Sequence, residues 1–105
     1  MRVYNVLTDF PQLKIALTHG AWTMFPTLVG MLPAFENLFI GLNCYLLMLG
    51  WRDYIDAANY LCQDQMMFGT CYPVCSAKFV VDFYEKAGFR EKVQHKIYYQ
   101  NAECF

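Results

Sequence analysis

Charged residues are scarce in this sequence and unevenly placed. They make up 16% of the 105 residues, whereas 57% are hydrophobic, and a globular domain normally has about 25% charged residues. Between Ile15 and Trp51 the only acid, base or histidine residues are His19 and Glu36, while six of the eight Lys and Arg residues and seven of the nine acids lie from Arg52 onward. The first half therefore lacks the charge that a small water-exposed surface needs.

Several signals of function are also missing. The net charge is −1 and no basic block occurs, so nothing indicates nucleic-acid binding. The first ten residues, MRVYNVLTDF, lack the features of a secretory signal or a transit peptide. The sequence contains no convincing nucleotide-binding loop, nucleophile with a base, or pair of catalytic carboxylates. We therefore expect no catalytic residue, no cofactor and no enzymatic activity.

The five cysteines cannot all pair within the chain, because their number is odd. Cys71 and Cys75 form a C-x-x-x-C pair, Cys62 precedes it by nine residues, and Cys44 has no evident partner. Zinc sites usually have four ligands, and no nearby histidine completes a set here. Reduced thiols are the simplest interpretation; a disulfide between Cys71 and Cys75 and a metal site are the alternatives.

The charge-poor half is long enough to cross a membrane twice, since about 20 apolar residues form one helical span. Residues 15–33 and 37–55 supply the two spans, and the proline-containing link PAFEN between them favours a tight turn. The predicted fold is therefore all-α, a membrane helical hairpin of two transmembrane helices. Arg2, Lys14 and Arg52 flank the spans, which indicates that both termini face the cytoplasmic or matrix side.

Two ionisable residues stand out within the hairpin. His19 lies about one turn into the first span, and Glu36 lies at the hairpin tip. Such residues are candidates for functional sites in membranes, for example in a proton relay. The simpler interpretation is that Glu36 is solvated and that His19 bonds to a neighbouring helix or reaches the interface.

The chain after the hairpin is predicted to be helical and aqueous. Residues 1–14 form an N-terminal aqueous segment, residues 15–55 the hairpin, and residues 56–105 a C-terminal helical extension. Ser76 is a plausible N-cap of a short helix that Gly88 ends. Apolar residues at three- and four-residue spacing mark one face of each predicted helix; they are Trp51, Tyr54, Ile55, Ala58, Leu61 and Cys62, and then Phe79, Val80, Phe83, Tyr84 and Ala87.

These apolar faces need a partner, because a chain this short covers them poorly in water. We expect them to contact other subunits of a multi-subunit complex and membrane lipids, including cardiolipin. The candidate partner and lipid contacts are Trp51, Arg52, Tyr54, Phe68, Phe79 and Phe83.

One stretch, GWRDYIDAANYLCQDQMMFGTCYP from Gly50 to Pro73, resembles a known family. Its Arg52-Asp53-Tyr54 group, Asp64, Met67-Phe68 and Pro73 are similar to the region after the second membrane helix of a small two-span accessory subunit of mitochondrial respiratory complex I. The resemblance covers about a quarter of the chain and implies a non-catalytic subunit that supports the membrane arm. The tail after Cys75 has no counterpart in that family.

The leading functional prediction is thus a non-catalytic accessory subunit of complex I in the mitochondrial inner membrane. ATP synthase, cytochrome oxidase and the cytochrome bc complex are alternative hosts. A transient assembly protein and a thiol-redox protein using Cys71 and Cys75 are alternatives from other functional classes. A non-membrane all-helical domain is a further alternative, because Pro26, Pro33 and Glu36 interrupt the apolar run.

Overall fold

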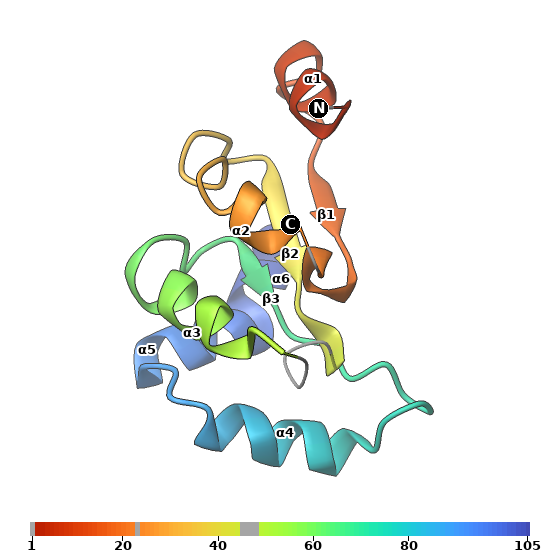
Figure 1. The fold of residues 1–105 in the computed structure, drawn as a ribbon, viewed down its shortest axis with the longest axis vertical. Coiled ribbons are helices and arrows are strands. Elements are labelled where there is room, and N and C mark those ends of the chain that lie inside the picture. Colours follow the sequence, from red (N-terminus) through yellow and green to blue (C-terminus); the bar gives the residue numbers. More distant parts are fainter. Residues whose placement is uncertain (1, 23, 45–48) are drawn as a thin grey trace.

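A computed structural model describes residues 2–22, 24–44 and 49–105 of the chain. In this part, three parallel strands form one sheet in the order β1-β2-β3 (Figure 1). The strands are β1 (Ile15–Leu17), β2 (Leu38–Gly41) and β3 (Met66–Met67). The helical elements are α1 (Arg2–Asp9), η1 (His19–Ala21), α2 (Phe25–Leu28), α3 (Trp51–Tyr60), α4 (Ala77–Lys86), α5 (Glu91–His95), the π-helical η3 (Lys96–Gln100) and α6 (Asn101–Cys104).

The middle strand, β2, is buried along its whole length. Ile40 pairs in register with Leu17 of β1 and with Met66 of β3. A parallel strand covered on both faces consists of consecutive apolar residues instead of alternating apolar and polar ones. This requirement explains why the sequence Leu-Phe-Ile-Gly carries no charge.

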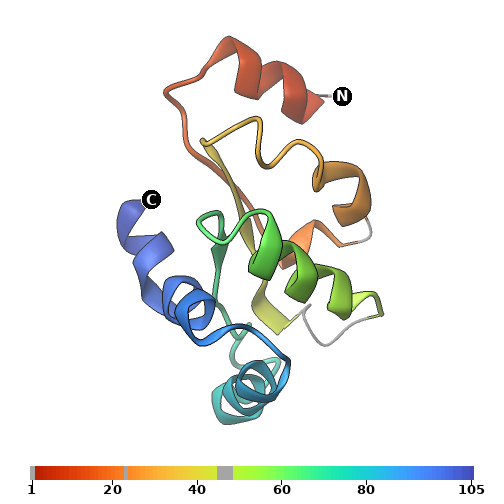
Figure 2. The ribbon, with the colours of Figure 1, turned by 90° about the vertical axis from the view of Figure 1, so that its left-hand side faces the viewer.

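Helices cover both faces of the sheet. Figures 1 and 2 show α2 and α3 on one face and the run from α5 to α6 on the other. On the second face, the Phe39 ring packs edge-on against the Phe105 ring at a centroid distance of 5.0 Å. The Lys14 ammonium donates a 2.7 Å hydrogen bond to the Cys104 carbonyl. The C-terminus is thereby held beside β1 and β2.

A buried glutamine joins β3 to the segment that leads into β2. The side-chain amide nitrogen of Gln65 lies 2.6 Å from the carbonyl oxygen of Leu32, 2.8 Å from that of Phe35 and 3.0 Å from that of Leu38. Its two hydrogens are therefore shared among three acceptors. Buried carbonyl groups need such donors, because leaving one unpaired costs free energy.

The predicted helix that starts at Ser76 is confirmed. The Ser76 hydroxyl accepts a hydrogen bond from the Phe79 amide at the N-terminus of α4, as an N-cap does. Val80 and Tyr84 are buried on one face of this helix. Gly88 follows the helix with φ +111°, a conformation that glycine adopts without strain.

The predicted all-α membrane hairpin is wrong. The first expected span, residues 15–33, contains β1, η1 and α2, and the second, residues 37–55, contains β2 and the start of α3; positions 23 and 45–48 of these spans lie outside the described residues. Among the residues that the structure describes, no helix combines the length and apolar character needed to cross a bilayer. Part of the apolar run is β2, which is buried along its whole length between helices, and β1 beside it is half-buried.

Candidate functional site

The carboxyl ends of the three strands meet at one edge of the sheet, above α4 in the view of Figure 1. His19, Asn43 and Cys71 lie in the loops that follow β1, β2 and β3, and their φ angles are +56°, +53° and +58°. Together with Ala21, they are the non-glycine residues with positive φ in the described part of the chain. This conformation costs L-residues roughly 1–2 kcal/mol and is concentrated at functional sites.

The loops after β2 and β3 are in close contact. A Cβ atom built on Gly69 would lie 2.2 Å from Oδ1 and 3.5 Å from Cα of Asn43, so a side chain at residue 69 would have to displace the Asn43 side chain. From α4, the buried Tyr84 hydroxyl donates a 2.9 Å hydrogen bond to the Asn43 carbonyl. Burial raises the pKa of Tyr84 above its ordinary value, which keeps this donor protonated. The loop after β2 is thus held both by the loop after β3 and by α4.

Three cysteines gather in the same two loops. Cys44 follows Asn43, and the turn after β3 contains Cys71 and Cys75, with the Val74 amide donating a 2.8 Å hydrogen bond to the Cys71 carbonyl. Burial raises the pKa of the Cys44 thiol to about 12, and its interactions with the Cys71 and Cys75 thiols add to the rise. All three are free and half-buried. Across the described ranges, no group of three His, Cys, Asp or Glu residues is arranged to hold a metal ion.

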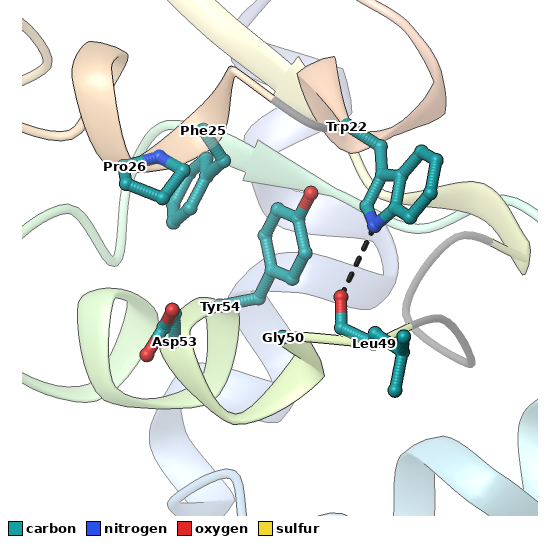
Figure 3. Close-up of a pocket in the computed structure, with 7 residues that line it drawn as sticks. All are labelled: Trp22, Phe25, Pro26, Leu49, Gly50, Asp53 and Tyr54. Atoms are coloured by element: carbon teal, nitrogen blue, oxygen red, sulfur yellow. Dashed lines mark hydrogen bonds between the residues drawn. The ribbon is translucent and has the colours of Figure 1, made fainter.

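A small pocket of about 180 Å³ opens between the loop after β1 and the start of α3 (Figure 3). The indole nitrogen of Trp22 donates a 3.1 Å hydrogen bond to the Leu49 carbonyl on its rim. The Tyr54 hydroxyl donates a 2.7 Å bond to the Gly20 carbonyl, and burial, with a smaller effect of Asp53, raises the pKa of Tyr54 to about 12. The lining is mostly apolar and consists of Trp22, Phe25, Pro26, Leu49, Gly50, Asp53 and Tyr54.

The residues expected to contact a partner or lipids lie elsewhere or point inward. Trp51 packs edge-on against Phe83 at a centroid distance of 5.4 Å, and the Arg52 guanidinium lies 5.2 Å from the centre of the Trp51 ring. Phe68 packs against the rings of Tyr84 and Tyr98. Tyr54 is buried, and Phe79 is 60% exposed on α4. Their contact with a partner stays a prediction.

Sequence reasoning missed most of this edge. It assigned His19 and Cys44 to membrane spans and found no partner for Cys44, whereas the structure places Cys44 beside Cys71 and Cys75. Glu36, expected at a solvated hairpin tip, is exposed just before β2. The available signal was the recurrence of short apolar runs, each followed by a turn containing histidine, asparagine or glycine, which is typical of parallel strands and their loops.

Solved structures that are similar to the chain include the following two. An uncharacterised TIM-barrel protein from Bordetella bronchiseptica is 33% identical, with a TM-score of 0.91 over 97% of this chain and 37% of that one. A 2,6-dihydroxybenzoate decarboxylase, solved with 2,6-dihydroxybenzoate, is 19% identical, with a TM-score of 0.71 over 93% of this chain and 36% of that one. The chain thus spans little more than a third of either protein. No curated protein matches it.

The family model described as amidohydrolase matches residues 1–105. This match overturns the expected membership among complex I accessory subunits, and with it the other respiratory-complex hosts, the assembly role and the thiol-redox role of Cys71 and Cys75. The expected mitochondrial inner-membrane location and the expected absence of enzymatic function are also wrong. The expected partners are not tested separately. Along its whole length, the chain belongs to the amidohydrolase family.

Proposed function

We propose that the chain belongs to an enzyme that hydrolyses or decarboxylates a small organic molecule, and that the carboxyl edge of its sheet forms part of the active site. The positive-φ residues at this edge carry the proposal, since His19, Asn43 and Cys71 each follow a different strand. In TIM-barrel enzymes the active site lies at this end of the strands, in the loops that follow them. The pocket beside Trp22 and Tyr54 adds a small apolar recess next to this edge.

His19 is our candidate for proton transfer. Hydrolysis of an amide gives a proton to the leaving nitrogen, and decarboxylation of an aromatic acid gives one to the ring carbon that loses carbon dioxide. Histidine is the side chain that enzymes most often use for such transfers. His19 is exposed at the edge, and its strained backbone directs the chain sharply away from β1.

Neighbouring groups would position the loops without taking part in proton transfer. Tyr84, whose pKa burial raises, donates to the Asn43 carbonyl and holds the loop after β2 in place. Tyr54 acts in the same way on the loop after β1, through its hydrogen bond to the Gly20 carbonyl. A side chain on Gly20 would be 2.8 Å from the Tyr54 hydroxyl oxygen, so this contact needs glycine.

The test compares the two histidines of the chain. The purified protein is assayed with a panel of small amides and with 2,6-dihydroxybenzoate, by release of amine and of carbon dioxide. His19→Asn should lower kcat roughly 10²–10⁴-fold, which is the usual contribution of a general acid or base. His95→Asn is the matched control, because His95 lies on α5 against Tyr99, and it should keep the activity of the unmodified chain.

Amide spectra in ¹⁵N-edited NMR should show that both variants are folded. Equal activity of the His19→Asn variant and its control would contradict the assignment of His19. A lack of turnover of every compound by the enzyme to which the chain belongs would contradict the proposed reaction classes.

A further inference from the structure

The loops after β2 and β3 bring three thiols together from distant parts of the sequence. The strands are adjacent, with Gly41 paired to Met67, and the space at Gly69 is filled by Asn43. Cys44 therefore lies against the turn that begins at Cys71 and ends at Cys75. All three side chains are half-buried, so small molecules in solvent can reach them.

We propose that Cys44 is the fixed partner in a reversible disulfide with the Cys71–Cys75 turn, formed through either thiol of the turn, which covalently joins the two loops at the carboxyl edge. The C-x-x-x-C pair itself does not close. This is a modification site in the loops and not the thiol-redox function that the family assignment contradicts. It stands independently of the proposed reaction.

A low-molecular-weight disulfide such as oxidised glutathione is the oxidant. A thiolate of the turn attacks one glutathione sulfur, the glutathione S–S bond breaks, and the first reduced glutathione leaves. The Cys44 thiolate then attacks the turn sulfur of this mixed disulfide and expels the second reduced glutathione. Two protein thiols are oxidised, one glutathione disulfide is reduced to two thiols, and the two protons pass to the departing glutathione thiolates.

The order of these steps follows from the environment of each thiol. Burial raises the pKa of Cys44 to about 12, and attack requires the thiolate. Cys44 is therefore the slow, resolving partner, and the first attack belongs to the turn. The two remaining cysteines are placed elsewhere, since Cys62 is buried after α3 and its thiol donates to the Ala57 carbonyl, while Cys104 is exposed near the C-terminus.

The test treats the purified chain with oxidised glutathione and maps its disulfides by mass spectrometry of non-reduced peptides. The unmodified chain, which has five cysteines, should yield a peptide pair joining Cys44 to the 71–75 segment, with loss of the two thiols that the link uses; any glutathione on the exposed Cys104 is counted separately. Cys71→Ser and Cys75→Ser should each keep one such link. Cys44→Ser should abolish it, and Cys104→Ser, the matched exposed control, should change nothing.

Dithiothreitol should restore all five thiols, and amide hydrogen exchange should be slower in residues 69–75 of the oxidised protein than of the reduced protein. A peptide pair joining Cys71 to Cys75 would overturn the proposal. Five free thiols after treatment, or loss of the Cys104 thiol alone, would overturn it equally. None of these measurements depends on catalysis. Absence of the Cys44 link would therefore not contradict the proposed reaction, and absence of enzymatic activity would not prevent the test of the disulfide.

Discussion

Two glycines test whether the loops after β2 and β3 are packed as tightly as the structure indicates. A Cβ atom at Gly69 would lie 2.2 Å from Oδ1 and 3.1 Å from Cγ of Asn43, whereas a Cβ atom at Gly30 would have no neighbour within 4 Å. Neither glycine has a positive φ. The same change to alanine therefore differs at the two positions mainly in the space that is available.

Gly69→Ala should lower the free energy of unfolding by about 1–3 kcal/mol, the usual cost of adding a methyl group to a filled site. The Asn43 side chain can reduce the overlap by rotating, which places the expected value in the lower half of that range. Gly30→Ala should change stability by less than about 1 kcal/mol, and in the stabilising direction, because alanine reduces the conformational freedom of the unfolded chain.

A double variant identifies the clash as the cause. Asn43→Gly removes the side chain that occupies the space and permits the same positive φ. In the Asn43→Gly variant, Gly69→Ala should lower the free energy of unfolding no more than Gly30→Ala does. Free energies come from urea titrations followed by circular dichroism, with the m-value checked for constancy. Equal stability of the Gly69→Ala and Gly30→Ala variants, or an undiminished cost in the Asn43→Gly background, would refute the reasoning.

Local features of the second half could be predicted from the sequence. The Ser76 cap, the apolar face of α4 and the turn at Gly88 depend on residues close together in the chain. The apolar face expected along α3 is also present at Tyr54 and Ile55, which are buried, although Leu61 is exposed. Helix caps and helical periodicity act over a few residues, so one sequence is enough to reveal them.

Composition alone does not distinguish this sheet from a membrane hairpin. A lipid-facing helix and a parallel strand between two helix layers both exclude charge, so each gives an uninterrupted apolar run. Strands of three, four and two residues, as in β1, β2 and β3, are too short for a periodic pattern. The prolines at positions 26 and 33 were the useful contrary signal, since each removes a helical hydrogen bond.

The candidate site was hidden for a different reason. His19, Asn43 and Cys71 are separated by 24 and 28 positions in the sequence, and they come together only because parallel strands end at one edge. Nothing local to Cys44 indicates that thiols 27 and 31 residues later are its neighbours. Long-range strand order decides this proximity, and the apolar pattern does not encode it.

Three further changes test contacts at both ends of the strands. Gln65→Met should lower the free energy of unfolding by about 2–4 kcal/mol in urea titrations, because two shared hydrogens are lost and buried carbonyls remain unpaired. The matched change at the exposed Gln100, Gln100→Met, should lower it by less than about 0.5 kcal/mol. Equal losses in the two variants would refute this prediction. Asp64→Asn should cost less than about 1 kcal/mol despite the 2.6 Å contact with Lys96, because Asp64 is 72% exposed, and a larger loss would contradict that estimate. Burial raises the pKa of Tyr54 to about 12 from an ordinary value of 10.0, so its contribution to stability is complete below pH 10 and is lost as the pH rises from 10 to 12. Ionisation of Tyr54 should lower the free energy of unfolding by about 1.4 kcal/mol per pH unit in this range. The Tyr54→Phe variant should be less stable than the unmodified chain at pH 8, but its free energy of unfolding should fall less steeply above pH 10. Parallel pH profiles of the two proteins would show that Tyr54 ionises equally in the folded and unfolded states.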